Sequence, residues 1–240
     1  MFVNTATERS LDLISQRAAD VYKAFTPGAL PERSDVETNA PQSRAALDPL
    51  SVSAPGDDYF MTFDERGRTT YTRDGQMRLA NGTVAGGNGR PMLGYIGNAS
   101  TAAELKIDPV DEALGRVRNL RIETDGTVAY DRRTVDPRSG LMQAQRVSLG
   151  RLALARFPAA TKLTNTADGT VMPPPGIVPH LGRAGDGNFG MLAPMRRDES
   201  RIDLNRSLER LHDAYVAFDA LQAVHKAQGQ TGKVAMDLLK

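Results

Sequence analysis

Residues 71–79 read YTRDGQMRL, and this stretch has the pattern of a tight strand–turn–strand element. Its first residues favour a pleated strand, and Asp74-Gly75 is a turn pair in which glycine can supply a positive φ. The apolar residues that follow recur with the period of two of a half-buried strand. We therefore expect the block to be a structural turn that sets hairpin register, with Arg73 satisfying nearby carbonyls or a carboxylate, and not a reactive site.

Similar turn signals divide the middle of the chain. Residues 59–95 are broken at DERG, RDG, NG and GGNGRP, and residues 119–133 contain a strand, an Asp-Gly turn and a second strand. The segment VSLGRLALARF (147–157) has apolar residues on an alternating pattern. Such pairs between alternating runs are strong hairpin signals. They predict an antiparallel β domain over residues 51–195, with the Pro/Gly-rich residues 169–190 as a loop leading out of it.

Both ends of the chain carry apolar residues in steps of three and four, the pattern of a helix with a heptad seam. The N-terminal set is Leu11, Ile14, Ala18, Val21 and Phe25, and the C-terminal set is Leu204, Leu208, Leu211, Tyr215, Phe218 and Leu221. We expect a helix within residues 1–27, an extended linker over 28–50, and a second helix within 196–240. Because such a seam is costly to leave in water, the second helix should pair with the first or with neighbouring subunits.

The predicted fold class is therefore mainly β. It consists of a central domain of antiparallel hairpins, with the heptad-patterned N- and C-terminal α-helices packing as a discontinuous helical domain.

Composition narrows the classes of function. The 240 residues are 40% apolar and 25% charged, and 30 basic residues oppose 29 acidic ones for a net charge of +1. That balance gives no electrostatic case for nucleic acid or an anionic membrane. Cysteine is absent, which excludes disulfides, thiolate zinc sites and a cysteine nucleophile. No apolar run suits a membrane span, and the first residues lack a Sec-type signal pattern, so we expect a cytoplasmic protein or one exported by another route.

No pattern for chemistry emerges from the side chains. His212 and His225 are 13 residues apart, His180 is remote in sequence, and none has the spacing of a shared metal. The acidic pairs lack the ligand order of a calcium loop, GGNGRP (86–91) lacks the lysine of a phosphate loop, and neither Ser139 nor Ser148 has a nucleophile-elbow setting. We expect no enzyme, no metal or cofactor and no small-molecule substrate.

The quoted block and its surroundings resemble the core signature of the bacterial flagellar hook and basal-body rod family. The residues that carry the resemblance are Tyr59-Phe60, Gly67, the block Tyr71, Thr72, Arg73, Asp74 and Gly75, then Met77, Leu79, Asn81-Gly82 and PMLG (91–94). Residues 120–130 and 149–170 resemble the family's second hairpin and its exit strand, and ESRID (199–203) resembles the start of its C-terminal helix. The N-terminal segment, Arg201 and APMRRD (193–198) depart from the family pattern.

The resemblance implies a structural, proximal-rod-like subunit of the basal body that serves motility. Such a subunit assembles through its terminal helices, here the two heptad sets, into a helical tube with copies of itself and with other rod and hook subunits. It lies in the periplasmic rod after type III export without a Sec signal, and it needs no cofactor, nucleic acid or membrane insertion. The alternative is a secreted or phage-tail-like β-rich binding or structural module.

Overall fold

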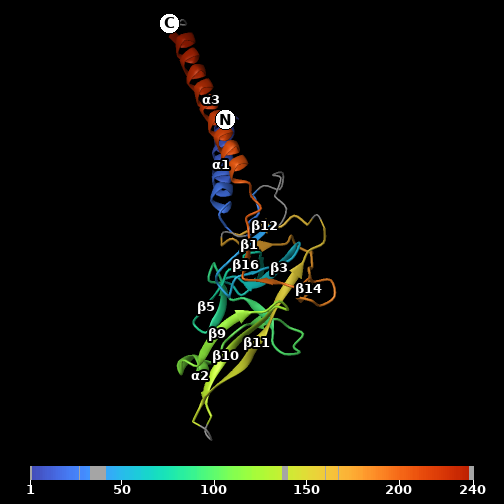
Figure 1. The fold of residues 1–240 in the computed structure, drawn as a ribbon. Helices are drawn as coiled ribbons and strands as arrows, with labels where there is room; N and C mark the ends of the chain where they lie inside the picture. Colours follow the sequence, from blue (N-terminus) through green and yellow to red (C-terminus); the bar gives the residue numbers. More distant parts are fainter. Residues whose placement is uncertain are drawn as a thin grey trace. The chain divides into compact units, whose positions relative to one another are not determined.

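The computed structural model describes residues 2–26, 28–32, 42–136, 140–159, 161–166 and 168–237 (Figure 1). These residues form two units. The helical unit contains α1 (Phe2–Lys23), α3 (Leu204–Asp237) and residues 31–32. The β unit contains the described residues of 26–30 and of 42–201.

The β unit is built around one antiparallel sheet of ten strands, in which the main order is β12-β13-β4-β3-β11-β10-β9. Strands β14 and β7 also pair with β11, and β8 pairs with β7; three two-stranded pairs, β1–β16, β15–β2 and β5–β6, complete the described strands. The bounds are β1 Ser43–Ala45, β2 Val52–Ser53, β3 Asp58–Phe63, β4 Thr69–Thr72, β5 Met77–Ala80, β6 Thr83–Gly86, β7 Leu93–Tyr95, β8 Ala103–Glu104, α2 Pro109–Ala113, β9 Val117–Ile122, β10 Thr127–Val135, β11 Met142–Arg156, β12 Thr164–Asn165, β13 Val171–Met172, β14 His180–Arg183, β15 Ala193–Pro194 and β16 Arg196–Asp198.

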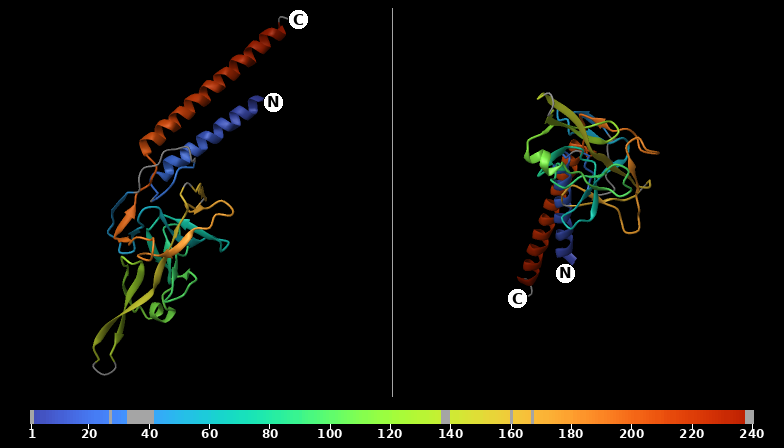
Figure 2. Two further views of the ribbon diagram at one scale, coloured as in Figure 1. Left: turned by 90° about the vertical axis from the view of Figure 1, so that its right-hand side faces the viewer. Right: turned by 90° about the horizontal axis from the view of Figure 1, so that it is seen from below.

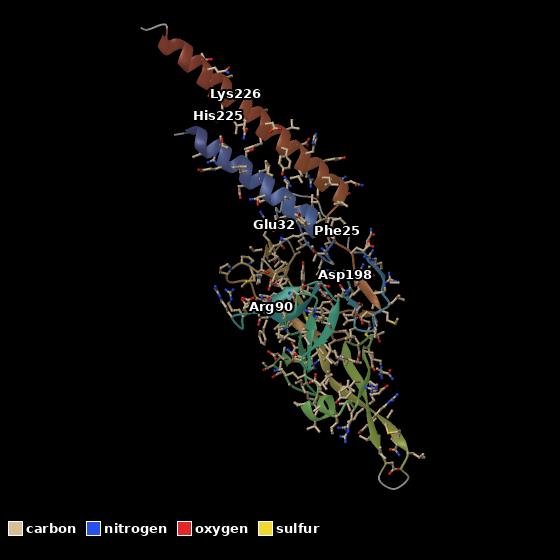
Figure 3. The ribbon with its side chains drawn as sticks, turned by 90° about the vertical axis from the view of Figure 1, so that its left-hand side faces the viewer. Phe25, Glu32, Arg90, Asp198, His225 and Lys226 are labelled. Carbon is tan, nitrogen blue, oxygen red and sulfur yellow. The ribbon has the colours of Figure 1, made fainter. Side chains whose placement is uncertain are left out.

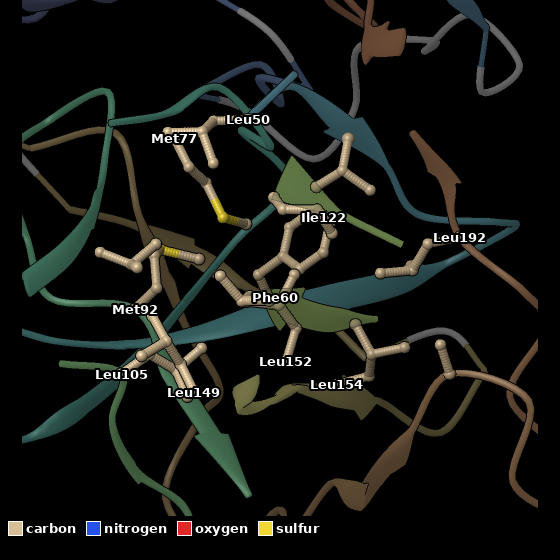
Figure 4. Packing of buried hydrophobic residues seen from close by; sticks show 14 of the residues in the cluster. Leu50, Phe60, Met77, Met92, Leu105, Ile122, Leu149, Leu152, Leu154 and Leu192 are labelled. Atoms are coloured by element: carbon tan, nitrogen blue, oxygen red, sulfur yellow. The ribbon is translucent and has the colours of Figure 1, made fainter. Parts of the chain in front are cut away.

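Strand β11 is covered on both faces along its C-terminal half. Leu152 and Leu154 point into the larger apolar cluster, which also holds Phe60 (Figure 4), whereas Ala153 and Ala155 belong to a second cluster on the other face. Leu149 and Leu152 are three residues apart, a spacing that would normally place them on opposite faces of a strand, yet both belong to the larger cluster. The reason is a β-bulge, because the register with β10 shifts between Val128 and Ala129, so that one residue of β11 is extra.

The fold class predicted from the sequence is wrong. The fold is mixed and β-dominated: a single ten-stranded antiparallel sheet with one N-terminal and one C-terminal helix replaces a domain of local hairpins with heptad-packed helices. Local hairpins β3–β4, β5–β6 and β9–β10 are present, but β11 joins β3, β7 and β14, which lie far from it in sequence. Local turn residues cannot encode such pairings. The predicted loop 169–190 likewise contains β13 and β14, and β1 lies in the predicted linker.

The hairpin predicted for residues 71–79 is also wrong. Strand β4 pairs with β3 and β13, while β5 pairs with β6, so the two flanking strands do not meet. Gly75 is not at positive φ. Its carbonyl instead accepts the Val52 N–H at 3.0 Å, and a Cβ at Gly75 would lie 1.6 Å from the Val52 carbonyl oxygen. Glycine is therefore required here because two backbones approach closely.

The boundaries of the β unit give a testable expectation for fragments. Residues 42–201 should show a cooperative β-type melt by circular dichroism, because this span keeps β1, β16 and Asp198 together with their partners. A fragment of residues 50–190 should be markedly less stable, because it loses Asp198 and leaves the buried Arg73 without its counter-charge. Equal melting temperatures for the two fragments would contradict this boundary.

Candidate functional site

Arg73 is the centre of the buried polar network in the β unit. The side chain is 1% exposed, and its Nε and Nη2 donate to Oδ2 of Asp198 at 2.9 and 2.5 Å. Nη1 donates to the carbonyls of Gly56 and Asp58 at 2.7 and 2.8 Å, and Nη2 also donates to that of Ala54 at 3.0 Å. The prediction that Arg73 satisfies carbonyls and a carboxylate is confirmed.

The other signature residues make contacts of their own beside this network. Tyr71 is buried, and its ring meets that of Phe157 edge-on at a centroid distance of 4.9 Å. The Asp74 N–H donates to Thr72 Oγ1 at 3.0 Å, and Asp74 Oδ1 accepts the Gln76 N–H at 2.9 Å. Burial raises the pKa of Asp74, and the charge of Asp198 adds to that rise. The contacts described for Tyr71, Thr72, Arg73 and Asp74 are therefore all made within the protein's own β unit.

A second ion pair joins the neighbouring strands β3 and β11. Arg156 donates from Nε and Nη2 to the two carboxylate oxygens of Asp58 at 2.6 and 2.9 Å, and Asp58 is fully buried. The guanidinium also lies over the ring of Phe189, 5.3 Å from its centroid. This bidentate pairing holds β3 against β11, and both carboxylate oxygens of Asp58 accept a hydrogen bond from Arg156.

The described residues show no grouping that would hold a metal ion. Nowhere among them do three His, Cys, Asp or Glu side chains gather at such a site. His180 lies on β14, and His212 and His225 lie on α3. No described helix has the length and hydropathy needed to cross a membrane.

The helical unit places the predicted N-terminal seam in two different environments. α1 packs against α3, and the N-terminal end of α1 lies toward the C-terminal end of α3, so the helices are antiparallel (Figure 2). Ile14 is 8% exposed, and Ala18 and Val21 are half-buried. Leu11 is 50% exposed, and Phe25 lies beyond the end of α1 with an exposure of 74% (Figure 3).

On α3 the contact face is rotated from the predicted seam. Its most buried residues are the small Ser207 and Ala214, and Leu211, Phe218 and Leu221 are half-buried beside them. The predicted Leu208 and Tyr215 are 46% and 50% exposed, and Leu204 is half-buried. Each exposed residue follows a buried one by a single position, which places it about 100° further around the helix. Sequence reasoning missed Ser207 and Ala214 because the seam predicted on this helix contained only large apolar side chains, although the spacing of seven between these two small residues was visible.

Four exposed apolar residues of the two helices share one side of the pair, whereas the exposed Val216 and Val224 of α3 lie elsewhere around that helix. Leu11 and Tyr22 on α1, like Leu208 and Tyr215 on α3, lie roughly 80–100° from their helix's contact face, in the same rotational sense. In an antiparallel pair, equal rotations of the same sense bring both sets to the same side. We call these four side chains the apolar flank. The apolar surface of each helix is thus wider than its partner covers.

Comparison with known proteins adds no relative. No family model matches the chain, and no curated protein sequence matches it.

Proposed function

We propose that the protein is a structural subunit of the bacterial flagellar basal-body rod, which assembles through its terminal helices for motility. The observation that carries the proposal is the apolar flank, which leaves Leu11, Tyr22, Leu208 and Tyr215 at least 46% exposed on one side of the helix pair. The flagellar setting rests on the resemblance of the YTRDG block and of the segments that follow it.

The energetics favour a partner for this surface. Full burial of an exposed large apolar side chain is worth about 1.5–3 kcal/mol. Leu11, Leu208 and Tyr215 are about half exposed and Tyr22 is 80% exposed, so covering each would recover roughly half or more of that amount. Contacts between different surfaces of identical subunits do not close on themselves but extend into helical assemblies. A contact surface on the terminal helices, with a β unit between them in the chain, suits a subunit of a helical tube.

Leu208→Asp is expected to leave the isolated subunit folded and to prevent its assembly. Leu208 is 46% exposed and is turned away from the most buried residues of α3, so its substitution should change the free energy of unfolding by about 1 kcal/mol or less. In the assembly, each copy would lose the leucine burial and would also have to desolvate a carboxylate. Cells whose only copy carries this change should not swim, and purified basal bodies should lack the subunit, while the melting curve stays normal.

Ala217→Asp is the matched control, because residue 217 is exposed on the same helix about 180° away from Leu208. This variant should assemble and support swimming. Leu211→Asp is less informative, because residue 211 is half-buried beside α1 and its loss would also disturb the helix pair. Normal swimming with Leu208→Asp would show that the apolar flank is not an assembly surface.

A further inference from the structure

The β unit carries a projecting arm with two exposed apolar residues at its last described strand pair. Strands β10 and β11 continue as a two-stranded ribbon past the last pairing with β9, at Arg132 (Figure 1). We call residues 133–135 and 142–144 the arm. Val135 and Met142 are direct cross-strand partners at its end, and they are 57% and 62% exposed. A two-stranded ribbon is marginally stable by itself, and apolar residues at its end cost free energy unless they are covered.

A hollow with both polar and apolar walls lies at the opposite end of the same strand. Its volume is about 260 Å³, and its walls include Leu30, Tyr59, Phe157 and Leu163, with Asp57 and Arg201 also lining it. Tyr59, which is 6% exposed, and the half-buried Phe157 meet edge-on at a centroid distance of 5.5 Å. Arg201 Nη2 donates to Asp57 Oδ1 at 2.8 Å, but the Asp57 side chain stays 74% exposed.

Strand β11 runs from the arm to the hollow. Met142 is its first residue, and Phe157 follows its last, Arg156. The 15-residue strand spans roughly 45–50 Å at about 3.3 Å per residue, so one arm cannot fold back into the hollow of its own chain.

We propose that the arm of one copy docks in the hollow of a second copy. The contact is heterologous, because a knob at one end of the β unit meets a hollow at the other, and repetition of such a contact gives an open filament. This inference rests on the proposed function, and it adds to the apolar flank a second contact between subunits, made by the β units.

Charge supports the same partner. Arg133 is exposed on the arm two residues before Val135, and therefore on the same face of β10. A second copy presents the exposed carboxylate of Asp57 beside the hollow. Docking of Val135 and Met142 against Phe157 and Leu163 would bring these opposite charges to the rim of the contact, where they favour the correct partner.

Disulfide trapping tests the contact in the full chain, which has no native cysteine. One chain carries Met142→Cys, and a differently tagged chain carries Ala159→Cys, an exposed position that lines the hollow. Oxidation of the concentrated mixture should give at least about tenfold more mixed disulfide than the control pair of Met142→Cys with Thr101→Cys, because docking raises the local concentration of one thiol near the other. Thr101 is exposed and does not line the hollow.

Exchange of the charges at residues 133 and 57 provides a second test. Arg133→Asp in the arm chain should lower the mixed-disulfide yield several-fold, and Asp57→Arg in the hollow chain should restore it. Equal yields for the hollow and control pairs would overturn the proposal, as would a dominant disulfide between two Met142→Cys chains, which would indicate a symmetric contact between arms. The proposed function has its own test in Leu208→Asp, so either idea can fail while the other stands.

Discussion

Gly75→Ala is expected to destabilise the β unit by at least about 3 kcal/mol, because the added Cβ would clash with backbone atoms and side-chain motion could not relieve the clash. This Cβ would lie 1.6 Å from the Val52 carbonyl oxygen, 2.8 Å from the Val52 carbonyl carbon and 3.2 Å from Cε2 of Phe60. Val52 and Phe60 are both fully buried in the larger apolar cluster. Relief requires separation of two backbones that are also joined by the Val52 N–H to Gly75 carbonyl hydrogen bond.

Gly67→Ala is the matched control for this prediction. Gly67 lies in the turn between β3 and β4 at φ +72°, and a Cβ there would meet nothing within 4 Å. The same methyl group should therefore cost only about 1 kcal/mol, from backbone strain. Urea unfolding of the full-length variants compares the two losses of unfolding free energy. Similar losses would show that close approach of the backbone is not the reason for glycine at position 75.

Turns that depend on neighbouring residues were predictable from the sequence. The DERG, Asn-Gly and Asp-Gly signals correspond to the β3–β4, β5–β6 and β9–β10 hairpins, and Gly67, Gly82 and Gly126 all have positive φ. In each case the conformational demand is local, so the residue that meets it can be recognised without a partner strand.

Features that depend on distant segments were not predictable in this way. The Asp74-Gly75 pair has the composition of a hairpin turn, yet its geometry is decided by Val52, more than twenty residues earlier. The same holds for the pairing of β11 with β14, and for Asp198, which lies 125 residues beyond the arginine that it neutralises. On α3 the heptad spacing was visible, but the contact face depends on how closely α1 approaches, and small residues allow the closest approach.

Asp198→Ala is expected to cost about 3–5 kcal/mol of unfolding free energy, because it leaves the guanidinium of Arg73 buried without a counter-charge. The two side chains are 1% and 5% exposed, so water cannot replace the lost carboxylate. Ser53 Oγ also loses the acceptor to which it donates. The control is Glu104→Ala, which removes an ion pair with Lys106, whose side chain is 61% exposed; the expected loss is below about 1 kcal/mol.

A double-mutant cycle separates the ion pair from the other roles of Arg73. Arg73→Met should be as costly as Asp198→Ala or more so, because it leaves Asp198 buried and removes the donors from the carbonyls of Ala54, Gly56 and Asp58. The double variant Arg73→Met/Asp198→Leu should lose less than the sum of the single losses, since neither buried charge then remains alone. Additive losses would mean that the two side chains act independently. The Arg73 of the YTRDG block would then be held by its carbonyl acceptors alone, and the segment that leads from β16 toward α3 would need another anchor.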